Sequence, residues 1–286
     1  MSMTIAAAGA AVPAARERHP EVFAAAARRK RRFQIALLVL AAYLAWSCWL
    51  FEITPARVFG GLDKMAVVLR QMVVWKDMAS WDYAGIFEGL AQTLAMAFLG
   101  TLVAALVAVP LGFLGARNVN GVKLLRWPVR RLFDLLRGID TLVWALVFVR
   151  AVGLGPLAGV LAIMTSDTGT LGKLYAEAVE NVDRKPMEGV RATGAGALQE
   201  LRFGALPQVL PVFLSQALYF FESNTRSATV LGVVGAGGIG LQLSDRIRVQ
   251  YWDQACFIIV LILVTVAVID FLSRKIRERF IGTSNA

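Results

Sequence analysis

The sequence predicts an all-α integral membrane protein with six transmembrane helices, and two observations support that class. The chain of 286 residues is 57% hydrophobic and only 17% charged, whereas about a quarter of the residues in a soluble domain are charged. Four long runs also lack Asp, Glu, Lys and Arg, and a helix needs about 20 apolar residues to cross a bilayer. The runs are Phe33–Phe51, Gly89–Ala116, Phe203–Phe221 and Gln254–Ile269.

The first two spans follow a polar tail over residues 1–32, which ends in the basic run Arg28–Arg32. We expect the first span over residues 33–53, and this run is too long for the apolar region of a cleaved signal peptide. The second span is expected over residues 88–115, where Pro110 can kink the helix. The segment between them carries aromatic side chains suited to a membrane interface, namely Trp75, Trp81 and Tyr83.

Four further spans are expected over residues 132–152, 157–175, 207–234 and 254–272. The third is the least regular, because three charged side chains at its start are expected to cluster at the inner end: Asp134, Arg137 and Asp140. Gly153-Leu154-Gly155-Pro156 predicts a tight turn before the fourth span.

The basic residues indicate how the chain is oriented. If there are six spans, one side of the membrane carries 21 Lys and Arg residues and the other side carries six. Because loops rich in Lys and Arg stay in the cytoplasm, both termini are expected to be cytoplasmic. The protein is therefore expected to be a multi-pass protein of the cell (inner) membrane.

The net charge of +10 does not point to nucleic acid as a partner. The basic residues occur in short clusters between apolar runs, without the basic face or aromatic platform of a nucleic-acid-binding domain.

Cys48 and Cys256 both lie within apolar runs and are expected to be inert. His19 is the only histidine, which argues against a metal site and against catalysis by histidine.

The segment 177–206 is a polar loop rich in helix-forming residues. Pro186 suits the first turn of a short helix, and Gly194 can end it with a positive φ angle. Leu198–Phe203 can then form a second short helix before Pro207 starts the fifth span. The predicted product is a compact helix-turn-helix beneath the membrane, and the alternative is an ordinary connector.

The spacing in this loop resembles the ATPase-coupling motif of permeases of type I ATP-binding-cassette (ABC) importers, E-A-A, three residues, G, nine residues, I-x-L-P. Glu188, Gly194, Leu206 and Pro207 keep that pattern, whereas other residues replace the two alanines and the isoleucine: Gly189, Val190 and Gly204. The resemblance implies an importer transmembrane domain over residues 85–275 in which this loop docks on an ATPase. The residues expected at the contact are Glu188, Arg191, Ala192, Gly194, Leu198, Phe203, Leu206 and Pro207.

Further stretches resemble the permeases of phosphonate importers: Leu171–Ala178, Arg191–Ala195, Leu206–Pro211, Arg226–Gly232 and Gly235–Gly240. This resemblance implies a homodimer that imports a phosphonate or a related phosphorus oxyanion, such as phosphate or phosphite. Its expected partners are a cytoplasmic ATPase dimer, an extracytoplasmic solute-binding protein and the lipid bilayer. No cofactor is expected in this chain, since ATP and Mg would be bound by the ATPase. The chain also lacks a Walker A motif of its own, because Gly172-Lys173 is followed by Leu174.

Charged and polar residues within the spans are candidates for the translocation pathway. Glu222 and Arg226 lie four positions apart, so they share one face of a helix. Either they form a structural pair, or they line the pathway and Arg226 offers a cation to an oxyanion. The pathway candidates are Ser166, Asp167, Thr168, Glu222, Asn224 and Arg226.

The segment Gly235–Gly240 matches the G-x-G-x-x-G pattern of dinucleotide-binding proteins. It follows a long apolar span and not a short strand, so we do not interpret it as a nucleotide site. The glycines suit close helix packing or a flexible external gate, and the residues of the predicted gate are Gly235, Gly237, Gly238 and Gly240.

Three rival interpretations stay open. The permease could carry another small solute such as methionine, since methionine-importer permeases resemble the same glycine-rich segment. A membrane-embedded enzyme is disfavoured by the single histidine and by the lack of a clustered nucleophile or metal constellation. A scaffold without transport would leave the charges in the spans unexplained.

Overall fold

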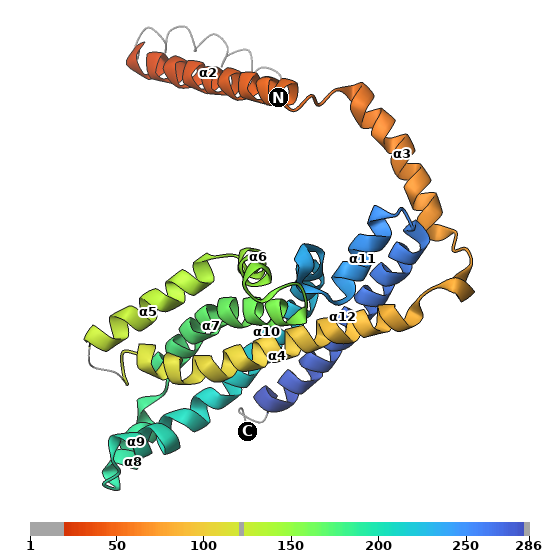
Figure 1. The fold of residues 1–286 in the computed structure, drawn as a ribbon. Coiled ribbons are helices and arrows are strands. Elements are labelled where there is room, and N and C mark those ends of the chain that lie inside the picture. Colours follow the sequence, from red (N-terminus) through yellow and green to blue (C-terminus); the bar gives the residue numbers. More distant parts are fainter. Residues whose placement is uncertain (1–19, 120–122, 283–286) are drawn as a thin grey trace, which may run out of the picture. The chain divides into compact units, whose positions relative to one another are not determined.

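The computed structural model describes residues 20–119 and 123–282, and within these ranges it contains helices and no strand (Figure 1). The chain divides into two units, residues 1–69 and 70–286, which are described separately below. The helices in chain order are α2 (Pro20–Leu50), α3 (Pro55–Val73), η1 (Met78–Ser80), α4 (Tyr83–Gly115), α5 (Lys123–Gly138), α6 (Thr141–Val152), α7 (Pro156–Glu180), α8 (Arg184–Ala192), α9 (Ala197–Glu200), η2 (Leu201–Ala205), α10 (Leu206–Leu231), η3 (Gly232–Ala236), α11 (Gly238–Arg248) and α12 (Trp252–Gly282).

The N-terminal unit contains α2 and most of α3. The segment Arg29–Leu50 of α2 is apolar and long enough to cross a membrane, as expected for the first span. It is followed by Glu52, whose φ angle of 52° ends the helical conformation. Residues 1–19 of the predicted tail lie outside the described residues.

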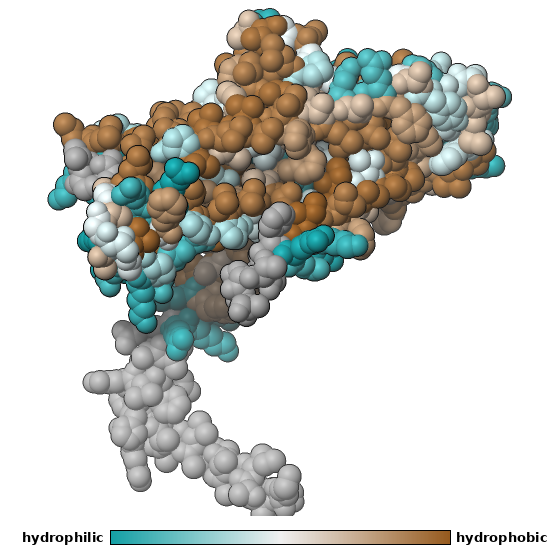
Figure 2. All heavy atoms as spheres, turned by 90° about the horizontal axis from the view of Figure 1, so that it is seen from below, coloured by the Kyte–Doolittle hydropathy of each residue, from teal (hydrophilic) through white to brown (hydrophobic). Residues whose placement is uncertain are grey.

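Four helical segments in the described ranges are long and apolar enough to cross a membrane: Arg29–Leu50, Tyr83–Gly115, Ala197–Ala236 and Trp252–Arg279. They correspond to the first, second, fifth and sixth predicted spans. The fourth predicted span lies in α7, whose 25 residues exceed the length needed to cross the hydrocarbon core. Helix α7 is not among these four segments, and it contains two charged residues in its central part, Asp167 and Lys173. The space-filling view shows that hydrophobic residues cover much of the visible surface, as expected where helices face lipid (Figure 2).

The prediction of one continuous helix over residues 132–152 was wrong. The structure divides this segment between α5, which ends at Gly138, and α6, which begins at Thr141. Asp140 causes the break, because its carboxylate accepts a hydrogen bond of 2.8 Å from the backbone N–H of Leu142 and caps α6. Asp140 therefore has a capping role here, whereas Asp134 contacts Arg131, Arg137 and Lys173.

Glycines allow α4 and α7 to pack closely along their length. A Cβ atom on Gly100 would lie 2.7 Å from the side chain of Ile163, and one on Gly112 would lie 2.8 Å from Cβ of Tyr175. Here the glycine is on α7 and the large side chain on α4: a Cβ atom on Gly159 would lie 2.6 Å from the sulfur of Met96. Small residues at such contacts let helices approach where lipid provides no hydrophobic driving force.

An aromatic cluster marks one end of the second unit. The ring of Phe257 on α12 lies 6.0 Å from Trp75, 5.6 Å from Trp81 and 5.7 Å from Tyr83 between centroids. Tryptophan and tyrosine concentrate at the boundary between lipid tails and water. The structure thus brings together the three aromatic residues for which the sequence predicts an interfacial position.

Candidate functional site

The polar loop folds as the helix-turn-helix that its sequence predicts. Asp183 caps α8 by accepting a hydrogen bond of 3.1 Å from the backbone N–H of Lys185. Gly194 ends this arm with a φ angle of +82°, in the left-handed region that favours glycine. The second arm consists of α9 and the π-helical turn η2, which continues directly into α10.

An ion pair connects the two arms of this hairpin. The guanidinium of Arg191 donates to both carboxylate oxygens of Glu200, at 2.9 and 3.0 Å. Glu200 is only 8% exposed, and a bidentate pair of this kind is more directional than a single contact. Arg191 was predicted as an ATPase contact; it has an internal partner and is also accessible, because its side chain is 69% exposed.

The surface of the hairpin is accessible and partly apolar. Leu198 is 80% exposed and Phe203 is 60% exposed, while Glu188 is also on the surface. A shallow groove of about 600 Å³ runs between the arms and includes Pro186, Gly194 and Phe203 in its lining. Figure 1 shows α8 and α9 together at one end of the helices of the second unit. Exposed apolar side chains around a groove are typical of a protein-binding surface.

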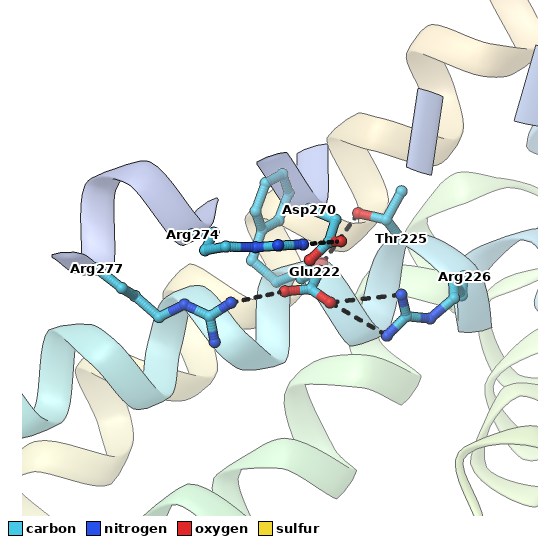
Figure 3. Close-up of polar contacts among 7 residues, drawn as sticks. Glu222, Thr225, Arg226, Asp270, Arg274 and Arg277 are labelled. Atoms are coloured by element: carbon cyan, nitrogen blue, oxygen red, sulfur yellow. Dashed lines mark hydrogen bonds and ion pairs between the residues drawn. The ribbon is translucent and has the colours of Figure 1, made fainter. Parts of the chain in front are cut away.

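A charged group connects α10 and α12. Glu222 is 7% exposed, and its Oε1 atom lies 3.4 Å from both terminal nitrogens of Arg226. Its Oε2 atom accepts a hydrogen bond of 3.1 Å from Arg277, as Figure 3 shows. The i, i+4 pair expected from the sequence is therefore part of a three-membered group. Arg277 was missed because it lies 55 positions away in the chain and no local pattern links it to Glu222.

Three of the remaining pathway candidates, Asp167, Thr168 and Asn224, lie in the interior of the chain. The amide nitrogen of Asn224 donates to a carboxylate oxygen of Asp167 and, at 2.8 Å, to the hydroxyl of Thr101. These three residues are 6%, 5% and 3% exposed, and they join α10, α7 and α4. Thr168 donates to the carbonyl of Met164 in its own helix. In the chain as described, this part of the predicted set is a buried polar network.

Ser166 and Thr141 connect α7 to the start of α6. The hydroxyl of Thr141 donates to Oγ of Ser166 at 3.1 Å. Ser166 is only partly buried, so it lies between the buried network and the surface. The contact ties the short helix α6 to α7 at the point where the predicted third span is broken.

The glycine-rich segment is tightly packed against its neighbours. Gly235, Gly237 and Gly238 have φ angles of +102°, +76° and +74°, so each adopts a conformation that favours glycine. The backbone N–H of Ile239 donates to the hydroxyl of Thr93 on α4 at 2.9 Å. A Cβ atom on Gly240 would lie 1.8 Å from the carbonyl oxygen of Thr229. The segment follows a helix and not a strand, which agrees with rejecting the dinucleotide motif.

A second polar contact missed from the sequence joins the C-terminal ends of α4 and α7 to the middle of α5. Glu180 accepts hydrogen bonds from the backbone N–H of Arg117, at 2.7 Å, and from the guanidinium of Arg130. Arg117 and Arg130 belong to the stretch Arg117–Arg131, which contains basic residues and no acidic one, and such a stretch is a signal that acidic partners lie elsewhere. Among the described residues, no group of three or more His, Cys, Asp and Glu side chains is arranged to hold a metal ion.

Membrane-spanning helices, an accessible helical hairpin at one end and a polar interior are the features of the membrane subunit of a transporter. The chain belongs to the family described as binding-protein-dependent transport system inner membrane component, whose sequence profile matches residues 108–281. It is therefore the inner-membrane permease subunit of an ABC importer, a transport protein and not a catalytic one. Membership implies a solute-binding protein and an ATPase as partners.

Three relatives are permeases of phosphorus-oxyanion transport systems. HtxC of Stutzerimonas stutzeri, assigned to a phosphite transport system, is 38% identical over 257 residues, which cover 90% of each chain. The phosphate-import permease protein PhnE of Mycolicibacterium smegmatis is 38% identical over 87% of this chain and 47% of its own. PhnE2 of Escherichia coli K12, assigned to a cryptic phosphonate transport system, is 54% identical over 42% of this chain and 99% of its own.

A solved structure shares the fold. The methionine ABC transporter MetNI in an inward-facing conformation contains a chain that aligns with a TM-score of 0.60 and 23% identity. The alignment covers 68% of this chain and 96% of that chain. At this level of identity the likeness establishes a common helical architecture and does not identify the solute.

Proposed function

We propose that this chain forms half of the translocation pathway of an ATP-driven importer for a phosphonate or a related phosphorus oxyanion, such as phosphite or phosphate. The observation that carries the proposal is the 38% identity to HtxC over 90% of both chains. The phosphate and phosphonate systems of the other two relatives support the same class of solute. A tetrahedral phosphorus oxyanion is the chemistry that these three systems have in common.

The permease works as a homodimer with six spans per chain and both termini in the cytoplasm. The excess of Lys and Arg on one side of the predicted spans supports this orientation. In it, α7 provides the fourth crossing, and α5 and α6 together provide the third. The second chain supplies the other half of the pathway, because no internal duplication of the transmembrane domain is evident in the sequence.

The hairpin of α8 and α9 docks in a cleft of the cytoplasmic ATPase. Its exposed Leu198 and Phe203, together with Glu188, provide the contact surface, and the Arg191–Glu200 pair keeps the arms together. Because η2 runs into α10 without a break, movement of the hairpin is transmitted to a membrane helix. The ATPase binds ATP and Mg and supplies the energy.

The glycine-rich segment lies at the external end of α10 and forms part of the external gate. Ala236 and Ile239 are both fully buried within the protomer, so they cannot themselves meet a second copy. Val233, which is 48% exposed, is accessible for that contact. The glycines position this surface by letting α11 pack tightly on α4.

The test is uptake into proteoliposomes that contain the permease, its ATPase and its solute-binding protein. We expect ATP-dependent accumulation of methylphosphonate, phosphite or phosphate, and no accumulation of D-methionine. Accumulation of methionine alone would overturn the solute assignment and retain the permease class. Cross-linking of the reconstituted permease would separately test whether it assembles as a dimer.

A further inference from the structure

Two guanidinium groups share a single carboxylate at the contact between α10 and α12. Arg226 and Arg277 approach opposite oxygens of Glu222, so these three side chains carry a formal excess of one positive charge. Buried carboxylates are retained where they are paired, and Glu222 satisfies that condition with Arg277 alone. The second cation is therefore in excess of what the burial of Glu222 requires.

Arg226 is the more weakly held of the two cations. Its contacts with Glu222 measure 3.4 Å, longer than the 2.7–2.9 Å typical of charge-assisted hydrogen bonds. Its side chain is 52% exposed, compared with 22% for Arg277. Because a guanidinium has five N–H donors, Arg226 can bind a second anion on its exposed side.

The face of α10 around Arg226 suits an oxyanion better than lipid. Ser223 and Tyr219 precede Arg226 by three and seven positions, so the three residues share one face of the helix. Tyr219 is 51% exposed and Ser223 is partly exposed, so this face of the helix carries two hydroxyl groups in addition to the guanidinium. An arginine directed into lipid tails is unfavourable, so this face belongs in a water-filled pathway.

The position along α10 places the charged group well inside the helix bundle. Arg226 follows Pro207, near the start of this helix, by 19 residues and precedes Gly235 of the glycine-rich segment by nine. Asn224, which lies between Glu222 and Arg226 in the chain, bonds to Thr101 of α4 and to Asp167 of α7. Glu222 and Arg226 therefore lie along the pathway and not at the cytoplasmic end of α10.

We propose that Arg226 binds the transported phosphorus oxyanion at this level of the pathway, and that Glu222 competes with the oxyanion for the same guanidinium. Arg277 is a positioning residue, because its contact with the other oxygen holds the carboxylate away from Arg226. The competition keeps the affinity low, which suits a site from which the solute must leave. This inference rests on the proposed function and assigns roles to residues within it.

The test measures binding of radiolabelled inorganic phosphate to the permease–ATPase complex in phosphatidylcholine nanodiscs, without the binding protein or nucleotide. We expect Arg226→Gln to weaken binding at least about tenfold, which corresponds to about 1.4 kcal/mol. Glu222→Gln removes the competitor and should tighten binding about threefold or more. Arg274→Gln is the matched control, since Arg274 pairs with Asp270, and it should bind as the wild type does.

Arg277 is tested by two further variants. Arg277→Gln alone should weaken binding, because it releases Glu222 towards Arg226, and Arg277→Lys should restore it. In the double variant Glu222→Gln with Arg277→Gln, binding should return to the tight level of Glu222→Gln, since no carboxylate remains to be positioned. A purely structural role for Arg277 predicts no such recovery, and that result would overturn its assignment.

Unchanged phosphate binding in Arg226→Gln, or no tightening in Glu222→Gln, would overturn the inference. A second set of nanodiscs with phosphatidylglycerol distinguishes the solute from a lipid headgroup of similar chemistry. If Arg226 determines retention of phosphatidylglycerol and free phosphate does not bind, the site belongs to lipid and the solute assignment is wrong. Uptake by the wild-type importer is measured in parallel, so failure of the proposed function appears as lost wild-type uptake and is distinguishable from failure of this site.

Discussion

The ring of Tyr175 on α7 stacks on the ring of Phe213 on α10, with the centroids 4.0 Å apart. The hydroxyl of Tyr175 also donates to the backbone carbonyl of Phe213 at 3.1 Å, and the side chains are only 1% and 3% exposed. The contact joins the helix that enters the hairpin to the helix that leaves it. It therefore anchors the base of the hairpin to the membrane domain.

Substitutions at this contact should lower stability by different amounts. Tyr175→Phe keeps the stacked rings and loses one hydrogen bond, which costs about 0.5–1.5 kcal/mol. Phe213→Ala removes the ring and leaves a cavity, which costs about 3–5 kcal/mol. Thermal unfolding of the detergent-purified protein should show the larger decrease in midpoint for Phe213→Ala. Equal decreases would mean that the hydroxyl contact, and not the packing, dominates.

Gly194→Val should uncouple the ATPase from transport. The φ angle of +82° is unfavourable for a β-branched residue, although nothing lies within 4 Å of the added Cβ. Gly196→Val is the matched control, because Gly196 also has open space around it and its φ angle is −75°. We expect membrane insertion in both variants and loss of solute-stimulated ATP hydrolysis only in Gly194→Val. Normal coupling in Gly194→Val would contradict the proposed docking role.

Glycine replacements in the second unit should separate the effect of crowding from that of backbone strain. Gly240→Ala places a Cβ atom 1.8 Å from a carbonyl oxygen, so the folded helices must move apart. Gly153→Ala meets no atom within 4 Å but retains a φ angle of +92°, which costs about 1–3 kcal/mol. The yield of folded protein after detergent extraction should decrease more for Gly240→Ala. The reverse order would show that backbone strain outweighs close packing.

The buried contact between Asp167 and Asn224 should behave as a coupled pair. Asn224→Leu leaves a buried carboxyl group without its amide donor, which costs about 1–3 kcal/mol or more. Adding Asp167→Leu removes the group that was left unsatisfied, so the double variant should lose less stability than the sum of the two single variants. Thermal unfolding of the four proteins gives the coupling energy. Additive losses would show that the two side chains do not interact.

Single cysteines should map the external gate. The background is a variant in which Cys48 and Cys256 are replaced by serine. In it, Val233→Cys should react with an external, membrane-impermeant reagent. Cross-linking of Val233→Cys between two copies should depend on the nucleotide state. Ile239→Cys should not react, because Ile239 is fully buried. Labelling of Val233→Cys only from the cytoplasmic side would overturn both the gate and the six-span orientation.

The sequence predicts best where the signal is local. Long uncharged runs predicted the spans that contain α4, α10 and α12, because crossing lipid requires a continuous apolar helix. The break before α6 had a local signal too, since an aspartate preceding a threonine and an apolar run is typical of a helix N-cap. It was missed because the charged residues there were interpreted as a cluster and not as a cap.

Contacts between segments that are distant in the sequence could not be predicted in this way. Arg277 joins Glu222 across 55 positions, and the side chains of Asn224 and Asp167 meet across 57. Periodicity places such residues on a face of their own helix and does not identify the helix opposite. The same reasoning applies to Ile239, whose burial against Thr93 depends on how α11 lies on α4.

The reciprocal fit of α4 and α7 has a consequence for how this protein can change during evolution. Gly100 accommodates the side chain of Ile163, Gly112 accommodates Cβ of Tyr175, and Gly159 accommodates the side chain of Met96, so each of these contacts requires that the glycine lack a Cβ atom. A gain of volume on one helix is tolerated only with a loss on the other. Across homologous sequences, we expect these three pairs of positions to covary. Pairs in which the small residue is on the other helix should be more frequent than pairs in which both residues are large.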